Sequence, residues 1–195
     1  MKQQTQYRLN KISKNLDYFF DNASDEDIIY GKEWYKKAND ICNQIASEYG
    51  TTTFVASQVI SALSPRNKWE QNILDAFKVF DAIRAGLSAD DIKVCTFHSN
   101  KYKAFAIANG TLEITPDSRK TYAFCRNIAH LDENYVTVDI WHLRACFNKV
   151  IKIDSASIGK KAYQQIQDIT LQKAKALGLT GFEYQAIIWG SIRNN

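Results

Sequence analysis

Two side chains stand where an amine and a carboxylate could carry out chemistry together. Lys120 follows Ser118 and Arg119 at the predicted start of one helix, and Asp139 follows the β-branched run 136–138 at the predicted start of another. A cation in the first turn of a helix faces the positive end of the helix dipole, and partial burial would add to this effect. Both favour the neutral amine that can act as a nucleophile. An amine and a carboxylate at two helix starts could therefore form an active site.

The same residues also allow simpler interpretations. Lys120 and Arg119 could be solvated first-turn residues, or a basic dipeptide that contacts phosphate, because lysines are common on protein surfaces. Asp139 precedes an apolar helix face, and Asp is a favoured N-cap. Capping and catalysis are compatible, because backbone N–H groups keep a cap carboxylate ionised while it points out of the helix start. Both interpretations stay open at the level of the residues.

The elements that position these residues are predicted to be helices. Apolar residues recur at spacings of three and four far more often than at two, a periodicity typical of an all-α protein. The runs 111–118 and 133–138 are predicted to be irregular, and each leads into one of the two helices above. The predicted helices cover 7–20, 31–48, 52–63, 67–84, 88–95, 100–109, 119–131, 140–148, 156–177 and 182–192.

Short-range pairs predict where several helices begin and end. A Ser or Thr three positions before an acidic residue is typical of a capping box at a helix start. Gly86 and Gly178 lie where helices are expected to stop. The predicted capping pairs are Ser24 with Asp27, Ser88 with Asp91 and Thr180 with Glu183.

Composition and cysteine spacing limit the class of protein. The 195 residues are 45% hydrophobic, which suits one globular unit, and Lys and Arg outnumber Asp and Glu by 25 to 21. This balance permits a DNA partner without requiring one. The four cysteines are scattered without CxxC or Cys/His clusters, so we expect neither a metal nor a disulfide framework. No apolar run approaches the roughly 18 residues that cross a bilayer, so we expect no membrane contact and an intracellular protein of the cytoplasm or nucleoid.

Four segments, taken in order, resemble the helix-hairpin-helix (HhH-GPD) DNA glycosylase superfamily, most closely its endonuclease III branch. The segments 118–121 and 136–144 are similar to the family's lysine and aspartate segments, and the 19 residues that separate Lys120 from Asp139 fit that pattern. The segment 54–64 resembles the family's early core helix, and 183–190 resembles its late helix ending in glycine. The resemblance covers about residues 52–192.

This resemblance implies an all-α, two-lobed bundle with a cleft between the lobes. The N- and C-terminal helices would form one lobe and about 52–148 the other, within a single glycosylase domain spanning 1–195. In the family, the lysine attacks the sugar carbon of a flipped nucleotide and the aspartate supports departure of the base. The resemblance therefore implies that Lys120 and Asp139 are catalytic in a base-excision DNA glycosylase with AP-lyase activity. We expect a monomer that needs no cofactor and acts on double-stranded DNA.

The resemblance also implies where DNA would be contacted. An enzyme that flips a nucleotide must fill the gap left in the stack, and the family places its wedge after the early core helix. Arg66 stands at that place, with Asn67 and Lys68 expected near the DNA backbone and Ser118 and Arg119 as further contacts. The alternative is an ordinary turn between helices, ended by an Asn67 cap.

Aromatic residues near these positions are candidates for a base pocket. Trp69, Trp141 and His142 could stack on a base, since stacking contributes roughly 1–3 kcal/mol per base. Trp141 and His142 follow Asp139 by two and three positions, so at least one is expected to face the same opening. Aromatic residues on helices more often belong to the core, which is the alternative for Trp69.

The chain departs from the family at two points. Pro116 and Ser118 occupy the places of two hairpin glycines, where backbone amides approach a DNA phosphate, and the four-cysteine cluster of much of the branch is absent. We therefore expect no iron–sulfur cluster. Three other functions stay open: a DNA-binding module that cuts no glycosidic bond, a nucleic-acid base-modification enzyme on the same scaffold, and a helical interaction protein with no DNA role.

Overall fold

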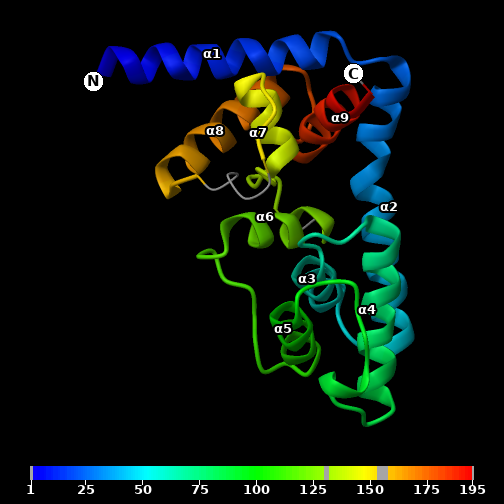
Figure 1. Ribbon diagram of the computed structural model, residues 1–195. Coiled ribbons are helices and arrows are strands. Elements are labelled where there is room, and N and C mark those ends of the chain that lie inside the picture. The colour runs from blue at the N-terminus through cyan, green and yellow to red at the C-terminus, as the bar shows by residue number, and fades with distance from the viewer. Residues whose placement is uncertain (1, 130–131, 153–157, 195) are drawn as a thin grey trace. The chain divides into compact units, whose positions relative to one another are not determined.

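The computed structural model describes residues 2–129, 132–152 and 158–194, and all their regular structure is helical (Figure 1). This confirms the predicted all-α class. The helices are α1 (Lys2–Asp21), α2 (Asp25–Tyr49), α3 (Thr53–Leu63), α4 (Trp69–Arg84), the 3-10 helix η1 (Ala89–Asp91), α5 (His98–Ala108), α6 (Arg119–Ile128), α7 (Ile140–Phe147), α8 (Lys160–Ala176) and α9 (Gly181–Asn194).

The predicted capping boxes form at all three sites. The backbone N–H of Ser24 donates to the Asp27 carboxylate at 3.0 Å, and the backbone N–H of Asp27 donates back to the Ser24 hydroxyl at 3.1 Å. The pairs that begin η1 and α9 make the same reciprocal contacts. Gly86 and Gly178 both adopt positive φ just after α4 and α8, as predicted for helix stops.

One predicted helix is much shorter than expected. The region 88–95 was expected to be helical, but only the three residues of η1 are. Side chains from elsewhere bond the backbone that follows: the Cys95 N–H donates to the Asp75 carboxylate at 2.7 Å, and the Lys101 amine donates to the Ile92 carbonyl at 3.0 Å. These contacts satisfy the backbone groups without a helix.

The chain divides into two compact units. Unit 1 contains the described residues of 1–36 and 132–195, and unit 2 contains those of 37–131. The sequence predicted a second lobe of about 52–148, which would have included α7. Instead α7 belongs to unit 1, because its buried residues Leu143 and Cys146 pack in the same core as residues of α1 and α9.

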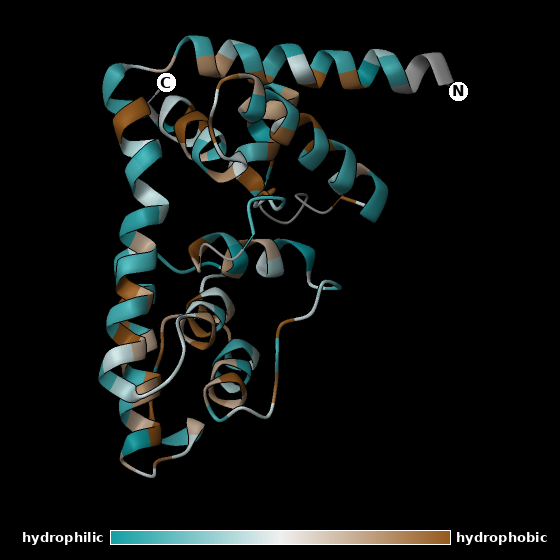
Figure 2. Cartoon of the chain, turned by 180° about the vertical axis from the view of Figure 1, so that it is seen from behind, coloured by the Kyte–Doolittle hydropathy of each residue, from teal (hydrophilic) through white to brown (hydrophobic). Residues whose placement is uncertain are grey.

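The core of unit 1 is formed by α1, α7, α8 and α9. Leu16 of α1 and Ile188 of α9 are completely buried in it, together with Cys146 of α7. The outer residues of α1 are hydrophilic, so this helix is mostly teal in Figure 2 and contributes an apolar stripe to the core. This core fixes the place where α7 starts, and with it Asp139.

The core of unit 2 is built around α3. Every residue of α3 from Ala56 to Leu63 is buried, and α4, α5 and α6 all contact this helix. The side of α4 that faces inward carries polar groups: the Asn72 amide donates to the Ile60 carbonyl at 3.0 Å, and Asp75 is fully buried. This core positions both the turn after α3 and the start of α6.

Candidate functional site

Asp139 is the N-cap of α7, as predicted, and its carboxylate accepts hydrogen bonds from two elements. The backbone N–H of His142 donates to Oδ1 at 2.9 Å. The indole N–H of Trp189, on α9, lies 3.2 Å from Oδ2 and 3.3 Å from Oδ1. Donors to a carboxylate favour its charged form. The half-buried Asp139 is thus held in one orientation at the helix start.

Sequence reasoning missed this contact. Trp189 is half-buried, and 50 positions of sequence separate it from Asp139. No local spacing links the two residues, so the only sequence signal was a tryptophan on a helix that resembled the family's late helix.

Lys120 lies in the first turn of α6, as predicted, but its side chain is exposed rather than partly buried. Ser118 is the N-cap residue, makes no side-chain cap hydrogen bond, and donates its backbone N–H to the Thr115 carbonyl at 3.0 Å. Within the described ranges, the Lys120 amine has no hydrogen-bond or ion-pair partner. Lys120 belongs to unit 2 and Asp139 to unit 1.

The turn that carries Arg66 is strained and firmly held. Arg66 has φ +58°, a left-handed conformation that costs a non-glycine residue about 1–2 kcal/mol. The Thr96 hydroxyl donates to the Pro65 carbonyl at 3.0 Å, and the Arg66 guanidinium lies 5.3 Å from the centre of the Phe97 ring. An observed strained residue on the surface is a reasonable candidate for function.

Asp75 anchors this turn from inside unit 2. Its carboxylate accepts from the Asn67 amide at 3.0 Å, the Gln71 amide at 2.9 Å and the Cys95 N–H at 2.7 Å, and the Lys78 amine is 3.3 Å away. The Asn67 side chain therefore stabilises the turn and does not cap α4. The N-cap residue of α4 is the exposed Lys68, which makes no side-chain cap hydrogen bond.

The structure excludes His142 from a base pocket. The side chain is completely buried, and its Nε2 lies 2.9 Å from the Thr170 hydroxyl. Because that hydroxyl donates its hydrogen to the Ile166 carbonyl, Nε2 is the donor to Thr170. Burial lowers the pKa of His142 to about 4. The imidazole is therefore a neutral core group, and the prediction of a base contact was wrong.

The two tryptophans of the predicted pocket are half-buried. Trp141 receives two cations: the Arg144 guanidinium lies 4.4 Å from its ring centre and that of Arg193 lies 5.8 Å away. Trp69 begins α4 and meets the Phe124 ring edge-on, with the ring centres 6.5 Å apart. Trp141 follows Asp139 in unit 1, whereas Trp69 lies in unit 2.

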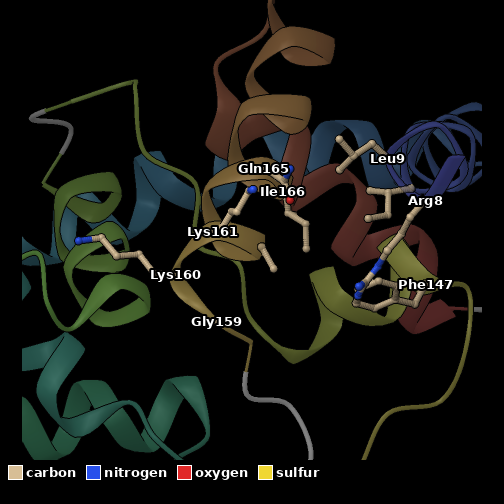
Figure 3. Close-up of a pocket in the computed structure, with 10 residues that line it drawn as sticks. Arg8, Leu9, Phe147, Gly159, Lys160, Lys161, Gln165 and Ile166 are labelled. Carbon is tan, nitrogen blue, oxygen red and sulfur yellow. The ribbon is translucent and has the colours of Figure 1, made fainter. Parts of the chain in front are cut away.

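An open pocket of about 600 Å³ lies elsewhere in unit 1, between α1, the end of α7 and the start of α8 (Figure 3). The Arg8 guanidinium lies over the Phe147 ring, 5.3 Å from its centre. Lys160 extends away from Arg8 in the same view, so the cations of this pocket do not converge on one point. None of the predicted site residues lines it.

The described ranges hold neither a cluster of metal-binding side chains nor a membrane-spanning helix. They contain no group of three or more His, Cys, Asp or Glu side chains placed to bind a metal ion. Among the same residues, no helix combines the length and the hydrophobicity needed to span a bilayer.

The comparisons with known proteins give a family without a known activity. A family described as "Family of unknown function (DUF7178)" matches residues 1–195. No curated protein and no solved structure matches the chain.

Proposed function

We propose that this chain, which belongs to the DUF7178 family, is a DNA glycosylase with AP-lyase activity and an HhH-GPD-type bundle with a cleft between its lobes. The observation that carries the proposal is the Asp139 carboxylate at one helix start, which accepts hydrogen bonds from His142 and Trp189 and is paired in the sequence motif with the exposed Lys120 at another. The all-helical fold is compatible with it.

Lys120 is the proposed nucleophile. Its amine forms a bond to the anomeric carbon of a flipped nucleotide as the bond between that carbon and the base breaks. The electron pair of the broken bond leaves with the base, which takes up a proton, and the attached lysine nitrogen loses one. Opening of the sugar ring gives a Schiff base, from which elimination can cleave the strand. An exposed amine that has no partner among the described residues suits this role.

Asp139 is proposed to stabilise the positive charge that develops on the sugar as the base departs. A carboxylate that is already oriented by two N–H donors does not have to reorganise during the reaction. The mechanism requires Lys120 and Asp139 to reach the same nucleotide.

The proposed DNA contacts come from polar side chains of unit 2, of which Arg119 is half-buried and the others are exposed. Arg66 is the candidate wedge, because its turn is held by hydrogen bonds while its guanidinium is on the surface. Lys68 and Arg119 are candidates for phosphate contacts, and the Ser118 hydroxyl makes no cap hydrogen bond that would compete. Trp141, two positions after Asp139, is the proposed stacking residue of the base pocket.

Borohydride trapping tests the catalytic proposal. The protein is incubated with duplexes that carry damaged or modified bases, and a covalent adduct is trapped by reduction of the Schiff base. We expect Lys120→Ala to abolish trapping and retain DNA affinity, and Lys103→Ala, an exposed lysine of α5, to trap like wild type. Unchanged trapping by Lys120→Ala would remove Lys120 from this role.

A second candidate function, a DNA-binding module without catalysis, is favoured by one observation. Lys120 is exposed, and burial is one of the factors that would otherwise favour its neutral amine. Such a module would bind duplex DNA with an affinity that falls steeply as salt rises, and would give no trapped adduct or alkali-sensitive site with any base in the panel.

A further inference from the structure

We propose that Trp189 is the positioning residue of Asp139, which its indole N–H holds in the orientation and charge state that the reaction uses. The inference rests on the proposed function for its catalytic meaning. The hydrogen bond itself can be measured without any activity.

The two donors fix Asp139 from different directions. The His142 N–H belongs to the same helix start as Asp139 and would be available to any cap residue in that place. The Trp189 indole comes from α9 and approaches both carboxylate oxygens, at 3.2 and 3.3 Å. The cap bond holds Oδ1 only, whereas the indole N–H contacts both oxygens and so adds a constraint on the rotation of the carboxylate.

A close contact between α2 and α9 sets the place of the indole. At Gly31 of α2 a Cβ atom would lie 2.5 Å from the Ile187 nitrogen, so a backbone contact fixes the spacing of the two helices. Gly190, next to Trp189, is equally tight, since its Cβ would lie 2.6 Å from Asp27 Oδ1. Trp34, one turn after Gly31, meets the Trp189 ring edge-on with the ring centres 5.5 Å apart.

The chemistry of the donor suits a carboxylate that must stay negative. An indole N–H donates a hydrogen bond but carries no charge and does not give up its proton in the physiological range. It therefore favours the ionised carboxylate and leaves its negative charge in place. A lysine or arginine at the same position would neutralise that charge. The negative charge of Asp139 is then available to stabilise the positive charge that develops on the sugar.

Three titratable groups close to Asp139 are kept neutral by burial. Tyr35 of α2 and Cys146 of α7 interact with its charge, and burial is the main reason that the pKa of each is raised. The His142 ring is neutral, with a pKa of about 4. Arg144 of α7 and Arg193 of α9 both lie against the Trp141 ring.

The first test is the titration of the Asp139 carboxyl group in the free protein, followed by carbon-13 NMR and assigned with Asp139→Asn. We expect Trp189→Phe, which keeps an aromatic ring but removes the N–H, to raise the titration midpoint by about one to two pH units. Trp189→His, which retains a ring N–H, should return the midpoint part of the way.

A matched control lies on the same helix. Tyr184 is buried with a hydroxyl that has no hydrogen-bond partner among the described residues, so Tyr184→Phe also removes one polar hydrogen from α9. We expect it to leave the Asp139 midpoint unchanged. Thermal unfolding of each variant reports whether a change in midpoint accompanies a loss of structure.

The second test is the pH dependence of Lys120-dependent trapping. Trp189→Phe should lower the trapping rate about tenfold or more at neutral pH and move the acidic limb of the profile upward by the same interval as the NMR midpoint. If Trp189 only stabilised the fold, Trp189→Phe would lower the trapping rate at every pH and would leave the acidic limb of the profile in place.

The outcomes separate the inference from the proposed function. An unchanged midpoint in Trp189→Phe overturns the inference, whatever the activity. A raised midpoint in a protein that forms no Lys120-dependent adduct supports the hydrogen bond and overturns the glycosylase proposal. A raised midpoint with an unmoved acidic limb shows that Asp139 does not act in the charged state, and overturns the catalytic part of the inference.

Discussion

The helix starts that carry the two candidate residues are built differently. At α7, Asp139 caps the helix with its own side chain and is bonded by Trp189 of another helix. At α6, Ser118 provides no side-chain cap bond and Lys120 extends into solvent. A group that only stabilises charge gains from being fixed in advance, whereas a nucleophile must travel to a carbon atom during the reaction. The contrast fits the roles proposed for them.

Unit 2 does contain a firmly held region, but it is the turn of Arg66 and not the start of α6. Asp75 accepts hydrogen bonds from Asn67 on one side and from the Cys95 backbone on the other. If this buried carboxylate holds unit 2 together, its removal should cause the largest loss of stability among the variants below.

Asp75→Ala is expected to lower the free energy of unfolding by about 3–5 kcal/mol, because a fully buried carboxylate is removed and the groups that donate to it or pair with it all lose their partner at once. Urea unfolding measures the loss. Asp81→Ala, which removes an exposed carboxylate of the same helix, is the control and should cost less than about 1 kcal/mol. Equal effects of the two would show that Asp75 does not hold unit 2 together.

The buried His142 of α7 should make the stability of unit 1 decrease at acidic pH. His142 has a folded-state pKa of about 4 against an ordinary value of 6.5, because burial disfavours its charged form. The neutral imidazole makes its full contribution to the free energy of unfolding above pH 6.5. As the pH falls from 6.5 toward 4, this contribution decreases by about 3 kcal/mol in all.

Urea unfolding at pH 7 and pH 4.5 of wild type and His142→Gln checks this dependence. Gln cannot take up a proton, so the variant should be less stable at pH 7 but should lose less stability between the two pH values. A parallel decline in both proteins would assign the acid sensitivity to other groups.

Direct comparison of the two helix starts requires alanine at each cap. Asp139→Ala should lower the free energy of unfolding by about 1–2 kcal/mol, because α7 loses its cap and the Trp189 N–H loses its acceptor. Ser118→Ala should change it by less than about 0.5 kcal/mol, since no cap bond is broken. Equal losses, measured by chemical denaturation, would contradict the contrast.

The smallest expected change is a gain. Glycine adopts a positive φ without strain, so Arg66→Gly should raise the free energy of unfolding by up to about 1 kcal/mol. The same variant should weaken binding to a duplex with a flipped or missing base, whereas Arg66→Lys should retain part of that affinity. Lower stability in Arg66→Gly would contradict this prediction and would mean that the side-chain contacts of Arg66, including the one with Phe97, outweigh the backbone strain.

Local sequence determined much of the secondary structure. The capping boxes at Ser24 and Thr180 and the cap at Asp139 all formed, because each depends on hydrogen bonds between groups three residues apart. Lys120 also lies in a first helical turn as predicted, although Ser118 makes no such bond there. Such bonds close within one turn of chain and need no partner from elsewhere.

Tertiary structure alone decided which groups surround those positions. Trp189 reaches Asp139 across 50 residues, and the Thr170 hydroxyl that meets the His142 ring is 28 residues away from it. The Cys95 N–H donates to the carboxylate of Asp75, 20 residues earlier, and the region 88–95 is mostly non-helical. These contacts depend on which helix faces meet in a packed core, and periodicity shows that a face is apolar without identifying its partner.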